Sequence, residues 1–315
     1  MQWIACLLML AAHGWDLQFR RGEALDRKGE FTSAAAAFEA ALVEAERLGP
    51  DDWRLPLTLH NLGTVDGQLS RYAEAERRYR RAIVIWESRH PRRQAELAAT
   101  LQGLGGIDLA LGRLSQAEPL YRRAYELRRK TLGEDHALTG ASLHALAELM
   151  HTRRRYVEAE DLYRRASTIL KRSRPDSLEL ADVTHNWALL YGDMHRDGEA
   201  RALFEEAWAA YQKTAPQHPK AAIVLRNLAD VEASGGDVAR AGDLFARSLR
   251  ICDFALPADH PQTGIILQAY ARFLAKAGKR KDARAAEERS RTILAKYSRE
   301  SGAGATVDVS AFMGR

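Results

Sequence analysis

A repeat of about 42 residues is the feature that most constrains how this chain can fold. Seven equivalent positions, which we call the markers, lie 41 or 42 residues apart along the 315 residues: Phe31, Tyr72, Leu114, Tyr156, Asp197, Val238 and Arg280. A near-constant period of this length is typical of proteins in which one supersecondary unit stacks on the next.

Residues of fixed size recur at fixed distances after each marker. Three positions after it the residue is always alanine: Ala34, Ala75, Ala117, Ala159, Ala200, Ala241 and Ala283. Seven positions after it stands a ring, except for Glu287 in the last repeat: Phe38, Tyr79, Tyr121, Tyr163, Phe204 and Phe245. Ten positions after it the residue is small again: Ala41, Ala82, Ala124, Ala166, Ala207, Ser248 and Ser290. Spacings of three and four place all of these on one face of a helix that packs closely on a partner.

Another column of small residues predicts that partner. Nine positions before each marker lie Gly22, Gly63, Gly105, Ala147, Ala188, Ala229 and Ala271. Each repeat is therefore predicted to be a hairpin of two helices, A and B, joined by a tight turn. Because one hairpin cannot bury its apolar face alone, neighbours must stack. The prevalence of Ala, Leu, Arg and Glu favours helices, and we expect an all-α superhelical solenoid of about seven hairpins over 15–298, followed by a flexible tail, 299–315.

The residues of these hairpins carry a resemblance to a known family. The stretch Asn61-Leu62-Gly63, followed by Arg71-Tyr72-Ala73-Glu74-Ala75-Glu76 and Tyr79-Arg80-Arg81-Ala82, resembles a tetratricopeptide repeat of the kinesin-light-chain type. The links Glu134-Asp135-His136 and Asp259-His260-Pro261 are similar to the acidic-His-Pro linker of that family. The resemblance covers about residues 15–298 and implies a scaffold that binds a protein or peptide. It does not identify the partner, because one solenoid fold serves many partners.

Polar residues on helix A are the predicted binding site. In the family that the chain resembles, helix A lines the concave surface, where an asparagine helps to hold an extended peptide. Carried over by position, that asparagine matches Asn61, Asn186 and Asn227, whereas Gly103, Ala145 and Ala269 stand in the same column and cannot replace it. The preceding column is polar in six consecutive repeats: His60, Gln102, His144, His185, Arg226 and Gln268. Side chains of these kinds can hydrogen-bond to a peptide backbone, and the three histidines would make the binding pH-sensitive.

A basic stripe on helix B supports an alternative function. Three successive repeats carry arginine pairs after the ring: Arg80 and Arg81, Arg122 and Arg123, Arg164 and Arg165. Stacked, these pairs would form an outer stripe for an acidic partner or a nucleic acid. Two observations favour an ordinary solvated face instead: acidic residues lie at helical spacing, and the column turns acidic at Glu205 and Glu206. We therefore do not expect nucleic acid to be the main partner.

The sequence gives no indication of catalysis. It contains none of the common metalloprotease, nucleophile-elbow or phosphate-loop motifs, and its two cysteines, Cys6 and Cys252, lack metal-binding spacing. Four histidines, His90, His136, His218 and His260, lie in links between repeats, too far apart to share one ion. We predict no catalytic residue, metal or cofactor, and assign these histidines to helix ends.

The apolar segment from Trp3 to Ala12 has two interpretations. With the small residues Ala12 and Gly14 after it, it is similar to a signal peptide cleaved after Gly14, which would direct the chain to the periplasm or outside the cell. Alternatively, it is an apolar cap on the first hairpin of a cytoplasmic protein. No basic residue precedes the segment, which argues against export, whereas the predicted start of a helix near Trp15 favours it. The run is too short to span a membrane.

Overall fold

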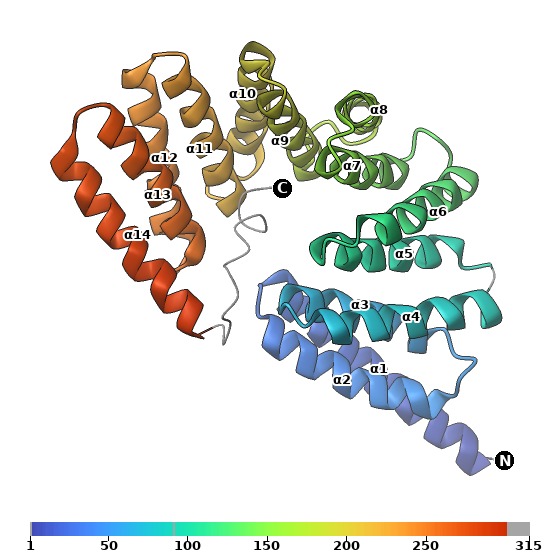
Figure 1. Ribbon diagram of the computed structural model, residues 1–315. Helices are drawn as coiled ribbons and strands as arrows, with labels where there is room; N and C mark the ends of the chain where they lie inside the picture. The colour runs from blue at the N-terminus through green and yellow to red at the C-terminus, as the bar shows by residue number, and fades with distance from the viewer. Residues whose placement is uncertain (1, 91, 301–315) are drawn as a thin grey trace. The chain divides into compact units, whose positions relative to one another are not determined.

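The computed structural model describes residues 2–90 and 92–300. Over these ranges the chain forms fourteen α-helices and no strand, which confirms the all-α prediction (Figure 1). The A helices are α1 (Gln2–Arg27), α3 (Arg54–Gln68), α5 (Gln94–Ala110), α7 (Ala137–Thr152), α9 (Leu178–Asp193), α11 (Pro219–Ser234) and α13 (Pro261–Lys276). The B helices are α2 (Phe31–Leu48), α4 (Tyr72–Arg89), α6 (Leu114–Leu132), α8 (Tyr156–Ser173), α10 (Asp197–Thr214), α12 (Val238–Ala255) and α14 (Arg280–Glu300).

Each of the seven markers is the first residue of a B helix, as the repeat predicts. Every A–B turn has the same construction. The residue two positions before the marker is in the left-handed region, with φ between 57° and 89°: Gly29, Ser70, Gly112, Arg154, His195, Gly236 and Gly278. The next residue donates its backbone N–H back to the A helix, as Arg71 does to the Asp66 carbonyl at 2.8 Å. This bond satisfies a carbonyl that the helix end would leave unpaired.

The columns of small and aromatic residues form the core. All alanines three positions after the markers are buried, and so are the six rings. The glycine column is the notch that receives the rings: a Cβ at Gly22 would lie 2.6 Å from the Phe38 ring, and one at Gly105 would lie 2.6 Å from the Tyr121 ring. Only glycine lets helices and rings approach this closely.

The chain divides into two compact units, which we call unit 1 (1–149) and unit 2 (150–315). The boundary falls within the last turn of α7. The core of unit 1 includes Trp15, Phe38 and Trp86. The core of unit 2 is built around such residues as Phe204 and Phe245.

The two ends of the solenoid differ in detail from the expectation. Helix α1 is continuous from Gln2, so Trp15 lies within a helix rather than at its start, and it is buried. None of the helices over the described part of the chain has the length and apolarity to cross a membrane. At the other end α14 continues to Glu300. The remainder of the predicted tail, 301–315, lies outside the described residues.

Three of the linker histidines cap helices. The Nδ1 atoms of His136, His218 and His260 accept the backbone N–H two residues later, at 3.1, 3.2 and 3.2 Å. Each bond satisfies an N–H group that the first turn leaves without a helical partner. His90 is different: it lies at the C-terminal end of α4, with its ring edge against Trp86. The expectation that all four histidines belong to helix ends is therefore met, but at two different positions.

Candidate binding faces on the A helices

In unit 1 the predicted site residues are partly exposed and come from three A helices. His60 and Asn61 lie on α3, Gln102 on α5 and His144 on α7. Asn61 donates its side-chain N–H to the Leu57 carbonyl of its own helix at 3.0 Å. His144 lies 3.7 Å from the Glu148 carboxylate one turn later. The Asn61 amide oxygen accepts no hydrogen bond from the described chain.

The ring of Tyr79 explains why glycine stands at position 103. A Cβ on Gly103 would lie 2.5 Å from this ring, and a Cβ on Gly63 would lie 3.0 Å from it. Tyr79 of α4 therefore lies between α3 and α5, and its hydroxyl is 2.9 Å from the Thr64 hydroxyl. Gly103 stands where other repeats have asparagine, and its lack of a side chain leaves space for the Tyr79 ring.

His60 does not behave as the pH-sensitive ligand that the sequence suggested. Its ring lies edge-on to Tyr79, with 5.7 Å between centroids, and its Nδ1 atom is buried without a hydrogen bond. Burial, together with the positive charge of Arg128, lowers the pKa of His60 to about 4. The imidazole is therefore neutral at physiological pH.

Arg128 is a functional candidate that sequence reasoning missed. It is only 6% exposed, and its Nη1 atom donates to the Gln102 side chain, to the Leu138 carbonyl at 3.2 Å and to the Ser142 hydroxyl at 2.8 Å. No carboxylate of the described chain pairs with it. Burial lowers the pKa of the guanidinium to about 10, so the charge is retained.

A signal for Arg128 was present in the repeat. Fourteen positions after each marker the other B helices have an alanine, a large apolar residue or a cysteine: Ala45, Trp86, Leu170, Tyr211, Cys252 and Leu294. An arginine in such a column breaks the pattern of the core. Its hydrogen bonds join α6 to α5 and α7, and they hold the Gln102 amide in place.

In unit 2 the predicted site residues are mostly buried. His185, Asn186, Arg226 and Asn227 are all 5–8% exposed. The Asn227 amide of α11 lies 2.8 Å from the His185 Nε2 atom of α9, which joins successive A helices. Arg226 donates to Asp230 of its own helix at 3.0 Å. These four residues were expected to line a concave groove, but in the described chain their side chains are largely covered, and their part in binding stays a prediction. Gln268 alone in this group is exposed.

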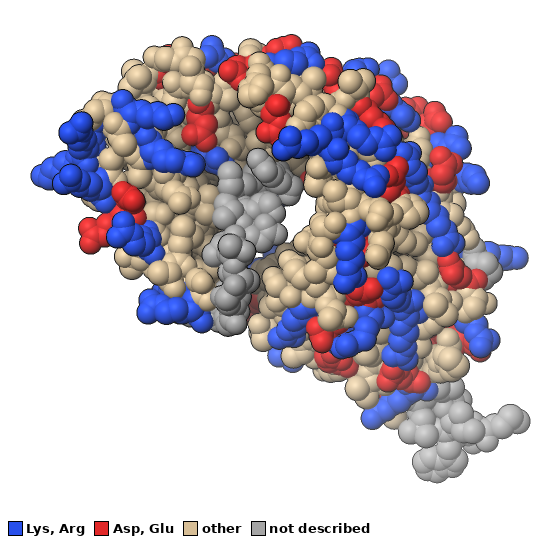
Figure 2. Space-filling view, viewed as in Figure 1, with Lys and Arg blue, Asp and Glu red and all other residues tan. Residues whose placement is uncertain are grey.

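The outer arginines are paired with acids. Arg80 and Arg81 contact Glu76 and Glu46, both at 2.9 Å. The other four also contact acids: Arg122 with Glu118, Arg123 with Glu87, Arg164 with Glu160 and Asp161, and Arg165 with Asp161. Figure 2 shows acidic groups among the basic ones on the visible face. Because these charges are largely compensated, the stripe is a poor site for a polyanion.

The described ranges hold no metal-binding cluster, and their buried Cys252 thiol is unreactive. They contain no group of three or more His, Cys, Asp or Glu residues that could bind a metal. Cys252 is buried, and burial raises the pKa of its thiol to about 11. A thiol of that pKa is not a reactive nucleophile.

Comparison with models of protein families supports the repeats that the sequence shows. Models of the tetratricopeptide repeat match residues 9–52, 57–91, 96–172, 179–253 and 227–296. A search of curated proteins finds no match.

Solved structures share the fold at low sequence identity. BtubC (BKLC) from P. vanneervenii has a TM-score of 0.61 and 22% identity, over 69% of this chain and 89% of that one. A putative kinesin light chain from Podosopora anserina has a TM-score of 0.55 and 24% identity, over 66% and 99%. Aspartyl phosphate phosphatase F from Bacillus subtilis has a TM-score of 0.64 and 15% identity, over 91% and 71%. With repeat models matching most of its length, the chain belongs to the tetratricopeptide repeat family.

Proposed function

We propose that this chain is a non-catalytic scaffold that binds an extended peptide or protein segment through the A helices of unit 1. At the coarser level, the tetratricopeptide repeats themselves support a role in protein interaction. The single observation that carries the finer proposal is the partial exposure of His60, Asn61, Gln102 and His144 in unit 1. Their counterparts in unit 2 are largely occupied with packing one A helix on the next.

The chemistry of this face suits a peptide backbone. The Asn61 amide oxygen can accept a backbone N–H, since only its N–H group is used within the helix. Gln102 is oriented by Arg128, which occupies its oxygen and leaves its amide N–H groups to donate to a peptide carbonyl. Donors and acceptors on successive helices match the alternating groups of an extended chain. In unit 2, Gln268 is the residue of the predicted set that is available in the same way.

Affinity capture from the source cell, followed by calorimetry with the recovered partner, tests this proposal. Asn61→Ala should weaken binding about three- to tenfold, as expected for one net hydrogen bond. The matched control is charge reversal of the outer pair Arg122 and Arg123, which should leave the affinity nearly unchanged. A partner lost with the outer pair and kept with Asn61→Ala would show that the outer stripe is the binding face.

Export is a further part of the proposal and concerns the segment before Trp15. Cleavage after Gly14 would remove the apolar run and keep the buried Trp15 and Phe19, which pack in the core of unit 1. Mass spectrometry of the protein from its native host decides the matter: a chain starting at Trp15 supports export, and a cytoplasmic chain with an intact Met1 contradicts it.

A further inference from the structure

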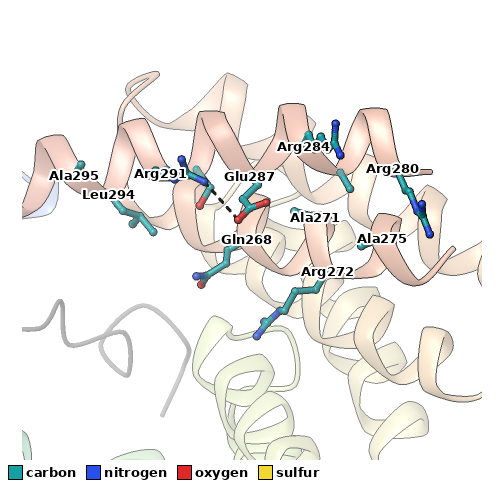
Figure 3. Close-up of a pocket in the computed structure, with 12 residues that line it drawn as sticks. Gln268, Ala271, Arg272, Ala275, Arg280, Arg284, Glu287, Arg291, Leu294 and Ala295 are labelled. Carbon is teal, nitrogen blue, oxygen red and sulfur yellow. Dashed lines mark ion pairs between the residues drawn. The ribbon is translucent and has the colours of Figure 1, made fainter. Parts of the chain in front are cut away.

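The last hairpin has an open groove on the surface where another A helix would pack. In the preceding hairpin, α11 and α12 both contact the next A helix, α13. No helix of the described chain covers the corresponding surface of α13 and α14. A groove of about 630 Å³ lies there, with side chains contributed by both helices (Figure 3).

The floor of this groove keeps the small residues that helix packing requires. Ala271, Ala283 and Ser290 line it and are 7%, 7% and 3% exposed. The aromatic ring is absent, because Glu287 takes its place and points to solvent. The groove is therefore hollow at the position where the other B helices carry a ring.

The rim of the groove carries unbalanced positive charge. Arg272, Arg280, Arg284 and Arg291 line it, against the single acid Glu287. Figure 3 marks the ion pair between Arg291 and Glu287, at 3.6 Å. The other three arginines are exposed and form no ion pair within the described part of the chain.

Three of the four arginines stand where the preceding B helix, α12, has apolar or small residues. In α12 the positions equivalent to Arg280, Arg284 and Arg291 are Val238, Gly242 and Leu249. A polar outer face is expected of a terminal repeat, which must remain soluble. Solubility, however, needs neither a hollow floor of small residues nor charges of one sign.

We propose that this groove, which we call the end groove, binds an acidic amphipathic helix of a partner protein. The floor of small residues matches the close approach of a helix, and the uncompensated arginines match acidic side chains along its edges. The site does not depend on the proposed peptide face of unit 1, so each can fail without the other.

Two alternative occupants are disfavoured by their charge. Residues 301–315 of this chain contain one acid, Asp308, and one base, Arg315. Helix α1 of a second copy, which an end-to-end assembly would place here, has equal numbers of acidic and basic residues. Neither offers the negative charge that the arginines would complement.

Fluorescence anisotropy with the full-length chain tests the proposal. The probe is a labelled helical peptide of about 16 residues, the length of an A helix, with Ala and Leu on one face and Glu on the others. Three comparison peptides carry Lys in place of Glu, central prolines that prevent helix formation, or the same acidic composition in scrambled order. We expect only the amphipathic acidic helix to bind well. Equal binding of the proline or scrambled peptide would overturn the proposal.

Variants of the chain locate the binding. The triple variant Arg272→Glu, Arg280→Glu, Arg284→Glu should weaken the probe by about tenfold or more. The matched control reverses three exposed lysines outside the groove, Lys276, Lys279 and Lys281, with the same change in net charge. Equal losses in both variants would reduce the binding to general charge attraction and overturn the proposal.

Filling the groove provides a test that leaves the charges intact. Ala275 lines the groove and is exposed, so Ala275→Trp should block the probe without disturbing the core. Unchanged binding would place the probe elsewhere and overturn the proposal. An intact chain that binds no probe, together with a Phe312→Asp variant that does, would instead identify the C-terminal segment as the occupant.

Discussion

Units 1 and 2 are built from the same repeat, but the polar residues of their A helices differ in environment: those of unit 1 are partly exposed, and most of those of unit 2 are buried. In unit 2, Asn227 reaches back to His185 on the preceding A helix. In unit 1 the equivalent of Asn227 is Gly103, against which the Tyr79 ring packs. His60, the equivalent of His185, therefore meets no amide from the next helix, and Asn61 turns to a carbonyl of its own helix. Whether a column residue is available to a ligand thus depends on what the next repeat places opposite it.

The largest predicted effect is the loss of stability that His60 of unit 1 causes at acidic pH. Its pKa lies at about 4, below the unfolded value of about 6.5, so the folded state binds the proton more weakly. The stability contributed by neutral His60 is present above pH 6.5 and is lost as the pH falls toward 4. The full shift corresponds to about 3 kcal/mol, and because the residue is partly exposed we expect about 2 kcal/mol.

Urea unfolding at several pH values measures this loss. His60→Gln should flatten the dependence of the unfolding free energy between about pH 6.5 and pH 4. Asn61→Ala, on the same face of unit 1, removes no titratable group, so it is the control and should retain the wild-type slope. An unchanged slope in His60→Gln would mean that the imidazole is solvated in the folded chain.

The two asparagines give the next largest contrast. Asn227→Ala removes a buried partner of His185 and should cost about 1–2 kcal/mol, after allowing for the better helix propensity of alanine. Asn61→Ala removes a bond within one helix and should change the unfolding free energy by less than about 0.5 kcal/mol. Thermal or urea unfolding of the two variants measures both values, and equal costs would contradict the contrast.

Most of the architecture was predictable because it depends on residue size at a fixed period. A ring such as Phe38 and a small residue such as Gly22 pack against each other because interiors are close-packed, and this does not depend on the surface residues. The site was less predictable. A polar residue that recurs in the repeat can be exposed to a ligand or buried between two A helices, and the sequence pattern does not distinguish the two. The polar column predicts that His185 and Asn227 line an open groove, but each of them covers the other across two A helices.

Charges gave partial information for the same reason. The arginine pairs of the outer stripe could be matched to nearby acids in sequence, but Arg123 pairs with Glu87 of the preceding B helix, a contact that only stacking creates. Arg128 was detectable as an arginine in a core column. Its role in orienting Gln102 requires the arrangement of three helices, which no local pattern specifies.

The smallest predicted effect concerns the A–B turns, which differ in composition between the units. In unit 1 two of the three left-handed residues are glycine and the third is Ser70, whereas in unit 2 Arg154 and His195 occupy two of four such positions. A side chain in this region is strained, and glycine relieves the strain but gains entropy in the unfolded chain. Arg154→Gly and His195→Gly should each raise the unfolding free energy by about 0.5–1 kcal/mol.

The converse change, Gly112→Ala, should lower it by a similar amount, because its φ of 70° is equally left-handed and a Cβ there meets no other atom within 4 Å. The φ angle alone therefore sets the sign, and urea unfolding of the three variants tests it. Destabilisation by His195→Gly would mean that the imidazole makes a stabilising contact exceeding the strain of its backbone.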